Sequence, residues 1–173
     1  MPGSGKSTIV SALKTKGFEA LNLGDGVRAE AKRRNLEPTG DNLGKLMLEL
    51  REKNGPGAIA ALLTEPIKNS QSKVIIIDGV RSTAEIEVLK NVGSVKLLSI
   101  EATADTRYKF LSSRGRSDDP ATREKFEERD NRELGVGIGE SIAIADETIS
   151  NSGITLDELT QLASKTIEKW IET

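Results

Sequence analysis

Apolar and polar residues follow two kinds of pattern along this chain, and the two patterns predict strands and helices in turn. Short runs of β-branched and other apolar residues predict strands at 18–23, 73–78, 95–100 and 147–150. The run KVIIID at 73–78 has no polar interruption before its aspartate, as expected of a parallel strand covered on both faces. Helical spacing separates these runs, so the pattern predicts an α/β fold with a mostly parallel sheet flanked by helices.

The stretches between the strands have helical periodicity. Helices are expected at 7–16, 25–69, 84–91, 105–133 and from Thr155 onward. Two of these stretches contain breaks. Prolines and glycines at 38–40 and 55–57 divide the long stretch 25–69 into two or three helices. The charged stretch 105–133 is interrupted at 114–120.

Two helices have a clear apolar face. The first is expected to bury Ile9, Val10 and Leu13. The last begins with a capping box formed by Thr155 and Glu158. Its apolar side chains are expected to point inward: Leu156, Leu159, Leu162, Ile167 and Ile171.

The composition narrows the possible chemistry. The 173 residues contain neither cysteine nor histidine, which excludes disulfides, thiolate chemistry, histidine-based zinc sites and catalytic triads. Acid–base work would fall to carboxylates, lysine or tyrosine.

With 25 basic and 27 acidic residues the net charge is −2, so no overall field attracts nucleic acid or an anionic membrane. We expect a single cytoplasmic domain, 1–173, because no apolar run could span a bilayer and no signal peptide is evident.

The strongest motif is the P-loop, PGSGKST at residues 2–8, which precedes the first predicted helix. Its glycines let successive backbone N–H groups face inward as an anion-binding nest, and the helix N-terminus adds positive charge. Lys6 would reach the β- and γ-phosphates, and the Ser7 hydroxyl would bind Mg²⁺. The alternative is a glycine-rich turn before an ordinary helix. The predicted ATP-binding residues here are Gly3, Ser4, Gly5, Lys6, Ser7 and Thr8.

The full P-loop pattern, G-x-x-x-x-G-K-[ST], is one residue longer than its match in this sequence. Its first glycine would stand one place before Met1, preceded by the strand that normally leads into the loop. That first, central strand is absent from this chain, and we expect the natural product to be longer at this end.

Two further motifs follow predicted strands. In IIIDGVRS, the Asp78 carboxylate would emerge beside the P-loop to bind Mg²⁺ or orient an attacking oxygen, and Arg81 could bind a phosphate. The alternative is an Asp-Gly turn with a solvated arginine. In LNLGDGVR, Arg28 would point toward the ligand edge of the sheet, and Asp25 either shares that site or caps the next helix.

The break at 114–120 places arginines where a mobile lid could bring them over transferring phosphates. Arg114 and Arg116 flank a glycine there. Arg129 is a further candidate, with a salt bridge to Glu133 as its alternative role. The glycine-rich GVGIGE at 135–140 is interpreted as a hinge or helix connection.

Together these motifs resemble the P-loop nucleoside monophosphate kinases, above all adenylate kinase, dephospho-CoA kinase and a largely archaeal, adenylate-kinase-related branch. GDGVR resembles the G-D-x-x-R of adenylate kinase, and DGVR resembles its D-G-F-P-R, one residue shorter and without the proline. RSDD at 116–119 is similar to the lid motif R-x-D-D. ADETISNSG at 145–153 is similar to a dephospho-CoA kinase motif in which the segment around Asn151 borders adenine.

The resemblance implies a division of the chain into functional regions. Residues 25–69 would form the acceptor-binding helices, 114–123 a short lid, and the missing strand the centre of a five-stranded parallel sheet. Mg²⁺-ATP would be the phosphate donor. The implied roles are catalysis by Lys6, Asp78, Arg114 and Arg116, acceptor binding by Asp25, Arg28 and Arg81, lid phosphate contacts from Arg114, Arg116 and Arg129, and metal binding by Ser7 and Asp78.

These observations predict an ATP-dependent kinase for a nucleotide-like acceptor, with AMP or another monophosphate slightly ahead of dephospho-CoA. The other class considered is a nucleotide-binding regulator with little turnover. A nucleic-acid-binding ATPase is disfavoured by the acidic balance and by the small number of aromatic residues. Small-molecule nucleotides are the expected partners, and the expected state is a monomer.

Overall fold

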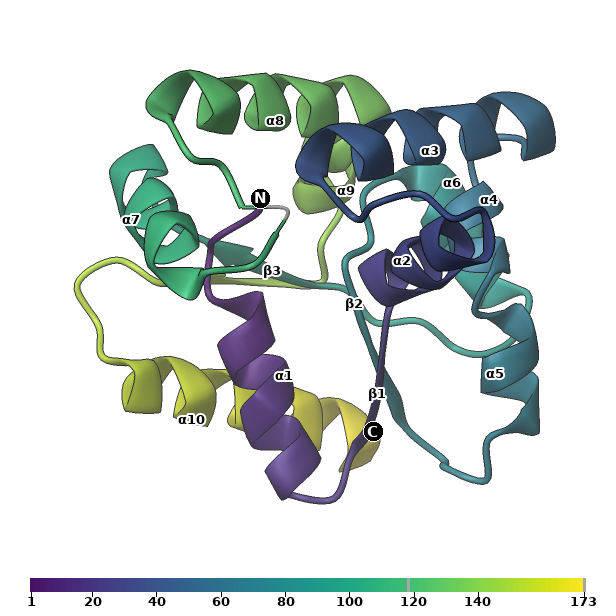
Figure 1. The fold of residues 1–173 in the computed structure, drawn as a ribbon. Coiled ribbons are helices and arrows are strands. Elements are labelled where there is room, and N and C mark those ends of the chain that lie inside the picture. The colour runs from purple at the N-terminus through teal and green to yellow at the C-terminus, as the bar shows by residue number, and fades with distance from the viewer. Residues whose placement is uncertain (118, 173) are drawn as a thin grey trace.

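The computed structural model describes residues 1–117 and 119–172, in which helices and parallel strands alternate (Figure 1). The predicted α/β class is therefore confirmed. The elements are α1 Lys6–Thr15, β1 Glu19–Asn22, α2 Leu23–Arg33, α3 Gly40–Asn54, α4 Ala58–Ala61, α5 Thr64–Asn69, β2 Ile75–Asp78, α6 Thr83–Lys90, β3 Leu98–Glu101, α7 Ala104–Arg114, α8 Arg123–Val136, α9 Ile138–Ala143, β4 Glu147–Ser150 and α10 Leu156–Glu172.

The strands form two parallel pairs rather than one continuous sheet. β1 pairs with β2 in a register that sets Asn22 opposite Asp78, and β3 pairs with β4. All of the predicted strands are present and parallel. They stay in two pairs because, in the part of the chain that the structure describes, no strand joins β2 to β3. Residues 2–5 form turns and bends at this point.

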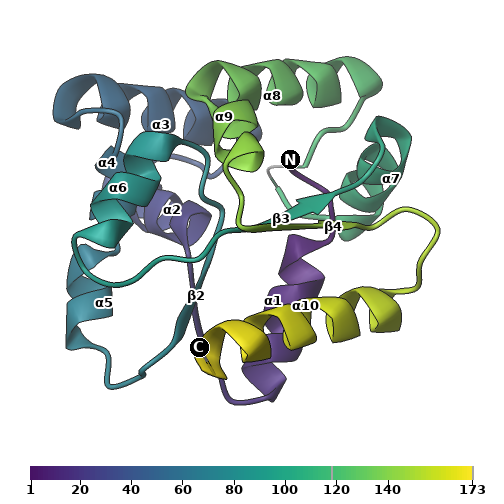
Figure 2. The ribbon, with the colours of Figure 1, turned by 180° about the vertical axis from the view of Figure 1, so that it is seen from behind.

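Two apolar clusters hold the elements together. One lies between α2, α3 and α4 and includes Leu23, Val27 and Ile59. The other joins α1, β3 and α10 through residues that include Leu13 and Leu159. Figure 2 shows α1 and α10 lying side by side beneath the second strand pair. The P-loop therefore begins a helix whose apolar face is fixed in a core.

The predicted inward face of the last helix is only partly correct. Leu159 and Ile167 are buried, whereas Leu156, Leu162 and Ile171 are 49%, 45% and 46% exposed. The buried stripe of α10 runs through residues spaced four apart, 159, 163 and 167. Leu162 lies off that stripe, whereas Leu156 and Ile171 lie in the first and last turns of the helix. On α1, Ile9 and Leu13 are buried as predicted, and Val10 is half-buried.

Helix boundaries in the stretch 25–69 also differ from prediction. It contains parts of four helices instead of two or three, because α4 and α5 are short and separate. α2 begins at Leu23, so Asn22 is its N-cap and accepts a hydrogen bond from the Asp25 backbone N–H at 3.2 Å. The capping role considered for the Asp25 side chain is therefore wrong.

The glycine-rich segments near the end of the chain behave as predicted connections. Gly115 ends α7 and Gly137 ends α8, both in the left-handed conformation, with φ of 73° and 106°. Within residues 1–117 and 119–172, no helix is both long enough and apolar enough to cross a bilayer.

Candidate functional site

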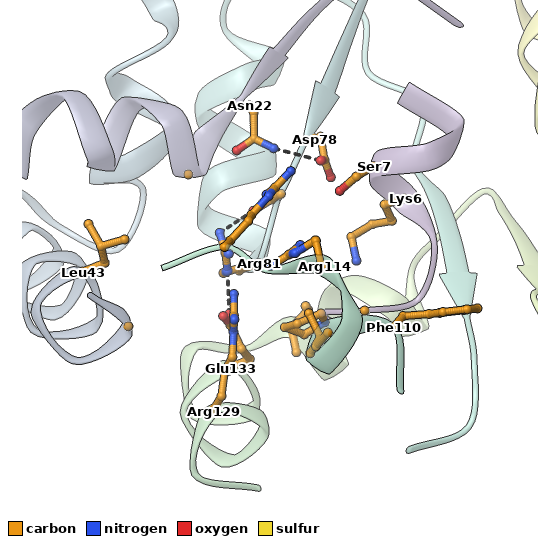
Figure 3. Close-up of a pocket in the computed structure, with 18 of the residues that line it drawn as sticks. Lys6, Ser7, Asn22, Leu43, Asp78, Arg81, Phe110, Arg114, Arg129 and Glu133 are labelled. Atoms are coloured by element: carbon orange, nitrogen blue, oxygen red, sulfur yellow. Dashed lines mark hydrogen bonds and ion pairs between the residues drawn. The ribbon is translucent and has the colours of Figure 1, made fainter. Parts of the chain in front are cut away.

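A cavity of about 280 Å³ opens where α1 begins and where β1 and β2 end (Figure 3). Ligands of parallel sheets bind at this edge of the strands. Most of the predicted site residues line the cavity: Gly3, Gly5, Lys6, Ser7, Thr8, Arg28, Asp78, Arg81, Arg114, Arg116 and Arg129. Ser4, Asp25 and Asn151 do not line it.

The P-loop needs glycine at two positions for two separate reasons. Gly3 and Gly5 have φ of 79° and 103°, in the left-handed region that L side chains rarely adopt. A Cβ atom on Gly3 would lie 2.6 Å from the Arg107 carbonyl oxygen, and one on Gly5 would lie 2.7 Å from Asn151 Nδ2. Both the backbone conformation and the close approach of neighbouring elements therefore exclude larger residues.

Asn151 supports the P-loop from outside the cavity. Its side-chain Nδ2 donates a 3.0 Å hydrogen bond to the carbonyl oxygen of Ser4, which is itself fully buried. The Asn151 backbone N–H donates to the Glu101 carbonyl at 2.7 Å, which ties the end of β4 to β3. Asn151 thus contacts the P-loop backbone rather than the cavity.

The Lys6 ammonium group points along the loop. Its Nζ donates to the Met1 carbonyl at 2.6 Å and to Ser4 Oγ at 3.2 Å. Burial lowers the Lys6 pKa from 10.5 to about 8, with Arg81 adding to the effect and Asp78 opposing it. A bound phosphate would supply the negative charge that this position lacks.

Asp78 and Ser7 form an oxygen-rich corner beside Lys6. Asp78 is 8% exposed, and its Oδ2 accepts a 2.8 Å hydrogen bond from Asn22 Nδ2 on the neighbouring strand. Figure 3 shows the Ser7 hydroxyl directed toward this carboxylate. Among the described residues no group of three or more acidic side chains could hold a metal by itself. One carboxylate and one hydroxyl nevertheless suit Mg²⁺, which usually completes its shell with water and substrate phosphates.

Arg81 is held in place from two helices. Its Nε lies 2.5 Å from Glu133 Oε2 on α8, and its Nη1 donates to the Gly79 carbonyl at 2.9 Å. The Arg81 backbone N–H donates to Glu85 Oε2 at 2.7 Å. Glu85 is fully buried on α6 and also pairs with Arg51 of α3 at 2.7 Å. The arginine therefore has a fixed backbone and a paired side chain.

The predicted lid arginines gather around one carboxylate. Asp119 accepts from Arg114 Nε at 3.1 Å and from the Arg116 backbone N–H at 2.8 Å, and Arg129 Nη1 lies 4.0 Å from it. Asp118, which belongs to the motif RSDD, lies outside the described residues. Arg28 reaches the cavity from α2 and pairs with the exposed Asp25 at 2.7 Å.

Several charged residues in and around this site carry no sequence signal of their role. The sequence predicts Glu133 only as a possible partner of Arg129, but the structure pairs it with Arg81. Arg107 is buried, and it donates to the Pro2 carbonyl at 3.2 Å and to Asp130 at 2.8 Å. Both lie on helices rich in charges of both signs, where sequence alone does not separate buried charges from solvated ones.

Comparison with known proteins agrees with this geometry. A family model described as an AAA domain matches residues 1–127. A UPF0200 protein of Pyrococcus abyssi is 41% identical over 156 residues, covering 87% of this chain and 83% of the relative. One from Methanothrix thermoacetophila is 41% identical over 173 residues, covering 98% and 93%. The chain belongs to the UPF0200 family.

A solved structure extends the comparison to the fold. The crystal structure of TT1252 from Thermus thermophilus matches this UPF0200 protein with a TM-score of 0.67 over 96% of this chain and 93% of that one. At 18% sequence identity, this likeness supports the fold alone. The matching family model and the UPF0200 relatives confirm the predicted P-loop kinase-like superfamily, and they support a nucleotide-binding domain. The names of the UPF0200 relatives state no substrate or reaction.

Proposed function

We propose that this UPF0200 protein transfers a phosphoryl group from ATP to a nucleotide-like acceptor, with AMP or another nucleoside monophosphate ahead of dephospho-CoA. The observation that carries the proposal is the content of a single cavity. The P-loop lysine Lys6, the strand-end carboxylate Asp78 and arginines from α2, α7, α8 and the β2–α6 loop all line it. Phosphoryl transfer depends mainly on such positioning and charge stabilisation.

On the donor side, the P-loop backbone and Lys6 would bind the triphosphate of ATP, with Asn151 keeping the loop in shape. Ser7 and Asp78 would hold Mg²⁺, which supplies charge neutralisation to the phosphates when bound. Asp78 would also orient the acceptor oxygen.

On the acceptor side, Arg28 and Arg81 would bind the acceptor phosphate, and residues 25–69 would surround the rest of the molecule. Val27, Leu43 and Met47 offer an apolar wall there. Residues 114–123 would act as the lid, with Arg114, Arg116 and Arg129 stabilising the transferring group. One copy of the chain is sufficient for this scheme, because every residue that acts on the nucleotides directly lines the same cavity.

A second function, nucleotide sensing with little turnover, is favoured by one observation. Arg81 and Arg114 are each paired with a carboxylate, Glu133 and Asp119, and must exchange these partners before they can bind phosphate. A protein in which that exchange is unfavourable would bind ATP without transferring it.

A direct assay separates the two functions. Purified protein is incubated with Mg²⁺-ATP and, in turn, each nucleoside monophosphate or dephospho-CoA, and products are separated by anion-exchange chromatography. The Lys6→Ala variant, prepared in the same way, reveals any contaminating kinase. Transfer to one acceptor that is absent with the variant supports the kinase. ATP binding without transfer to any acceptor supports the sensor.

A further inference from the structure

Arg132 of α8 lies at the end of the cavity that faces away from the P-loop. Its guanidinium packs over α3 at Gly44, where an added Cβ would lie 2.7 Å from Nη1 and 2.9 Å from Cζ. Leu43, the neighbour of Gly44, lies across the pocket from Lys6 and Ser7 in Figure 3. Arg132 therefore faces the part of the cavity assigned to the acceptor, at a distance from the reacting phosphates.

Within the described part of the chain, Arg132 has no partner for its charge. Its Nε is buried without a hydrogen bond, and it forms no ion pair with any residue among 1–117 and 119–172. The two carboxylates that flank it in sequence on α8 are already engaged, Asp130 by Arg107 and Glu133 by Arg81. A partly desolvated cation without a counter-charge is unfavourable, so a bound anion would stabilise this position.

Three other arginines of the cavity provide a contrast. Arg28, Arg81 and Arg114 each have a carboxylate partner. The Arg132 guanidinium instead occupies a space left by Gly44 in the middle of α3, a position where glycine is less favourable to a helix than alanine. The planar guanidinium donates two parallel hydrogen bonds to a phosphate group, which makes phosphate its best-matched ligand.

We propose that the acceptor carries a second phosphate, separate from the one bound by Arg28 and Arg81, and that Arg132 binds this second phosphate beside Gly44. This inference rests on the proposed function and narrows its substrate class to a nucleoside bisphosphate rather than a monophosphate. Arg132 is here a specificity residue, because it contacts the acceptor away from the reacting atoms.

The test compares two ligands that differ by one phosphate. AMP and adenosine 3′,5′-bisphosphate are titrated calorimetrically into the wild-type protein, into Arg132→Met and into Lys125→Met. Lys125 lies on the same helix but outside the cavity and the lid, and its change to methionine is the matched control. We expect the wild type and the control to bind the bisphosphate about 10-fold to 100-fold more tightly than AMP, the range of one charge-assisted hydrogen-bonded contact. Arg132→Met should bind both ligands about equally.

A second variant tests the same contact in case Arg132→Met does not fold. Gly44→Ala keeps the arginine but fills the space its guanidinium occupies, and it should reduce the preference for the bisphosphate while leaving AMP affinity within about twofold. Thermal melts of each variant without ligand show whether the fold survives.

Three outcomes overturn the inference: equal affinity of the wild type for both ligands, a preference that survives in Arg132→Met, or binding of neither ligand. Selective binding without phosphoryl transfer from ATP supports the Arg132 site and counts against the kinase. Transfer to AMP with equal affinities supports the kinase and overturns the Arg132 site.

Discussion

The two ends of the cavity are built by different means. At the P-loop end, the chain is fixed by backbone geometry and by hydrogen bonds to backbone carbonyls, such as that from Asn151 to Ser4. At the proposed acceptor end, the Arg81 guanidinium is held by a carboxylate from another segment, Glu133 of α8. The hydrogen bond from Asn151 lies outside the cavity, so it need not change when a ligand binds. The ion pair of Arg81 with Glu133 lies in the cavity and would have to be exchanged for the ligand.

This difference indicates how the two substrates would be received. The donor site is already shaped for its phosphates, so ATP binding should require little rearrangement. In the proposed scheme Arg81 would bind the acceptor phosphate only by releasing Glu133, which would lower affinity and raise selectivity, since only a well-matched anion would replace this carboxylate effectively. Substitutions at one end of the cavity should therefore affect one substrate more than the other.

The largest effect is expected from Lys6→Ala. In the proposed mechanism the ammonium group would stabilise charge on the transferring phosphoryl group, so its loss should reduce kcat by about 10²–10³-fold. Circular dichroism should show the fold retained, because Lys6 makes no contact in either apolar cluster. A kcat near that of the wild type would exclude the proposed kinase mechanism.

Arg81→Ala should affect the acceptor end alone. We expect acceptor affinity to fall by about 10-fold to 100-fold, the range for a charge-assisted hydrogen bond, with ATP affinity nearly unchanged. Arg28→Ala should show the same selectivity with a smaller loss, because the Arg28 side chain is 30% exposed. Calorimetry with each ligand separately gives the comparison.

One control is needed for Arg81→Ala, which leaves Glu133 buried without its partner. The double variant Arg81→Met with Glu133→Gln removes both charges and should regain thermal stability without regaining acceptor affinity. Equal losses for ATP and acceptor would place Arg81 outside the acceptor site.

Asn151→Ala should lower the free energy of unfolding by about 1–3 kcal/mol, since the buried Ser4 carbonyl loses its hydrogen-bond donor. Asn151→Asp should be worse, because it sets a carboxylate oxygen against that carbonyl. Denaturant melts measure both. Affinities for ATP and GTP should fall by the same factor, because this contact is with the loop. A loss confined to ATP would show instead that Asn151 contacts adenine.

The smallest effect concerns pH. Lys6 releases its proton at about pH 8 in the folded protein and near 10.5 when unfolded. Between these values the unfolded chain holds the extra proton, so stability should rise with pH by at most about 1.4 kcal/mol per unit. Below pH 8 both states hold the proton and this contribution is constant. Melts from pH 7 to 10 should show the rise in the wild type and not in Lys6→Met. Parallel curves would contradict the lowered pKa.

The P-loop itself could be predicted from the sequence because its motif is local, whereas the supporting contact from Arg107 could not. Gly3 to Thr8 are consecutive, and the strand end at Asp78 is marked by a continuous apolar run. The acceptor end was only half predictable. Arg28 and Arg81 follow strands, but Glu133 and Arg132 come from a distant helix with charges on every face. No periodicity separates a buried charge from a solvated one there, so their partners emerge only from packing.

Glu85 has a consequence for how this sequence can diverge. It accepts from Arg51 of α3 and from the backbone of Arg81, and it is fully buried. Substitution of Arg51 alone would leave the buried Glu85 carboxylate without its ion-pair partner, and substitution of Glu85 alone would leave the Arg51 guanidinium without one. Each single change is expected to be unfavourable, whereas a simultaneous exchange that keeps an acceptor for the Arg81 backbone N–H, such as Arg51→Met with Glu85→Gln, need not be. Arg51 and Glu85 should therefore be inherited as a linked pair, and libraries that randomise one of them should sample both.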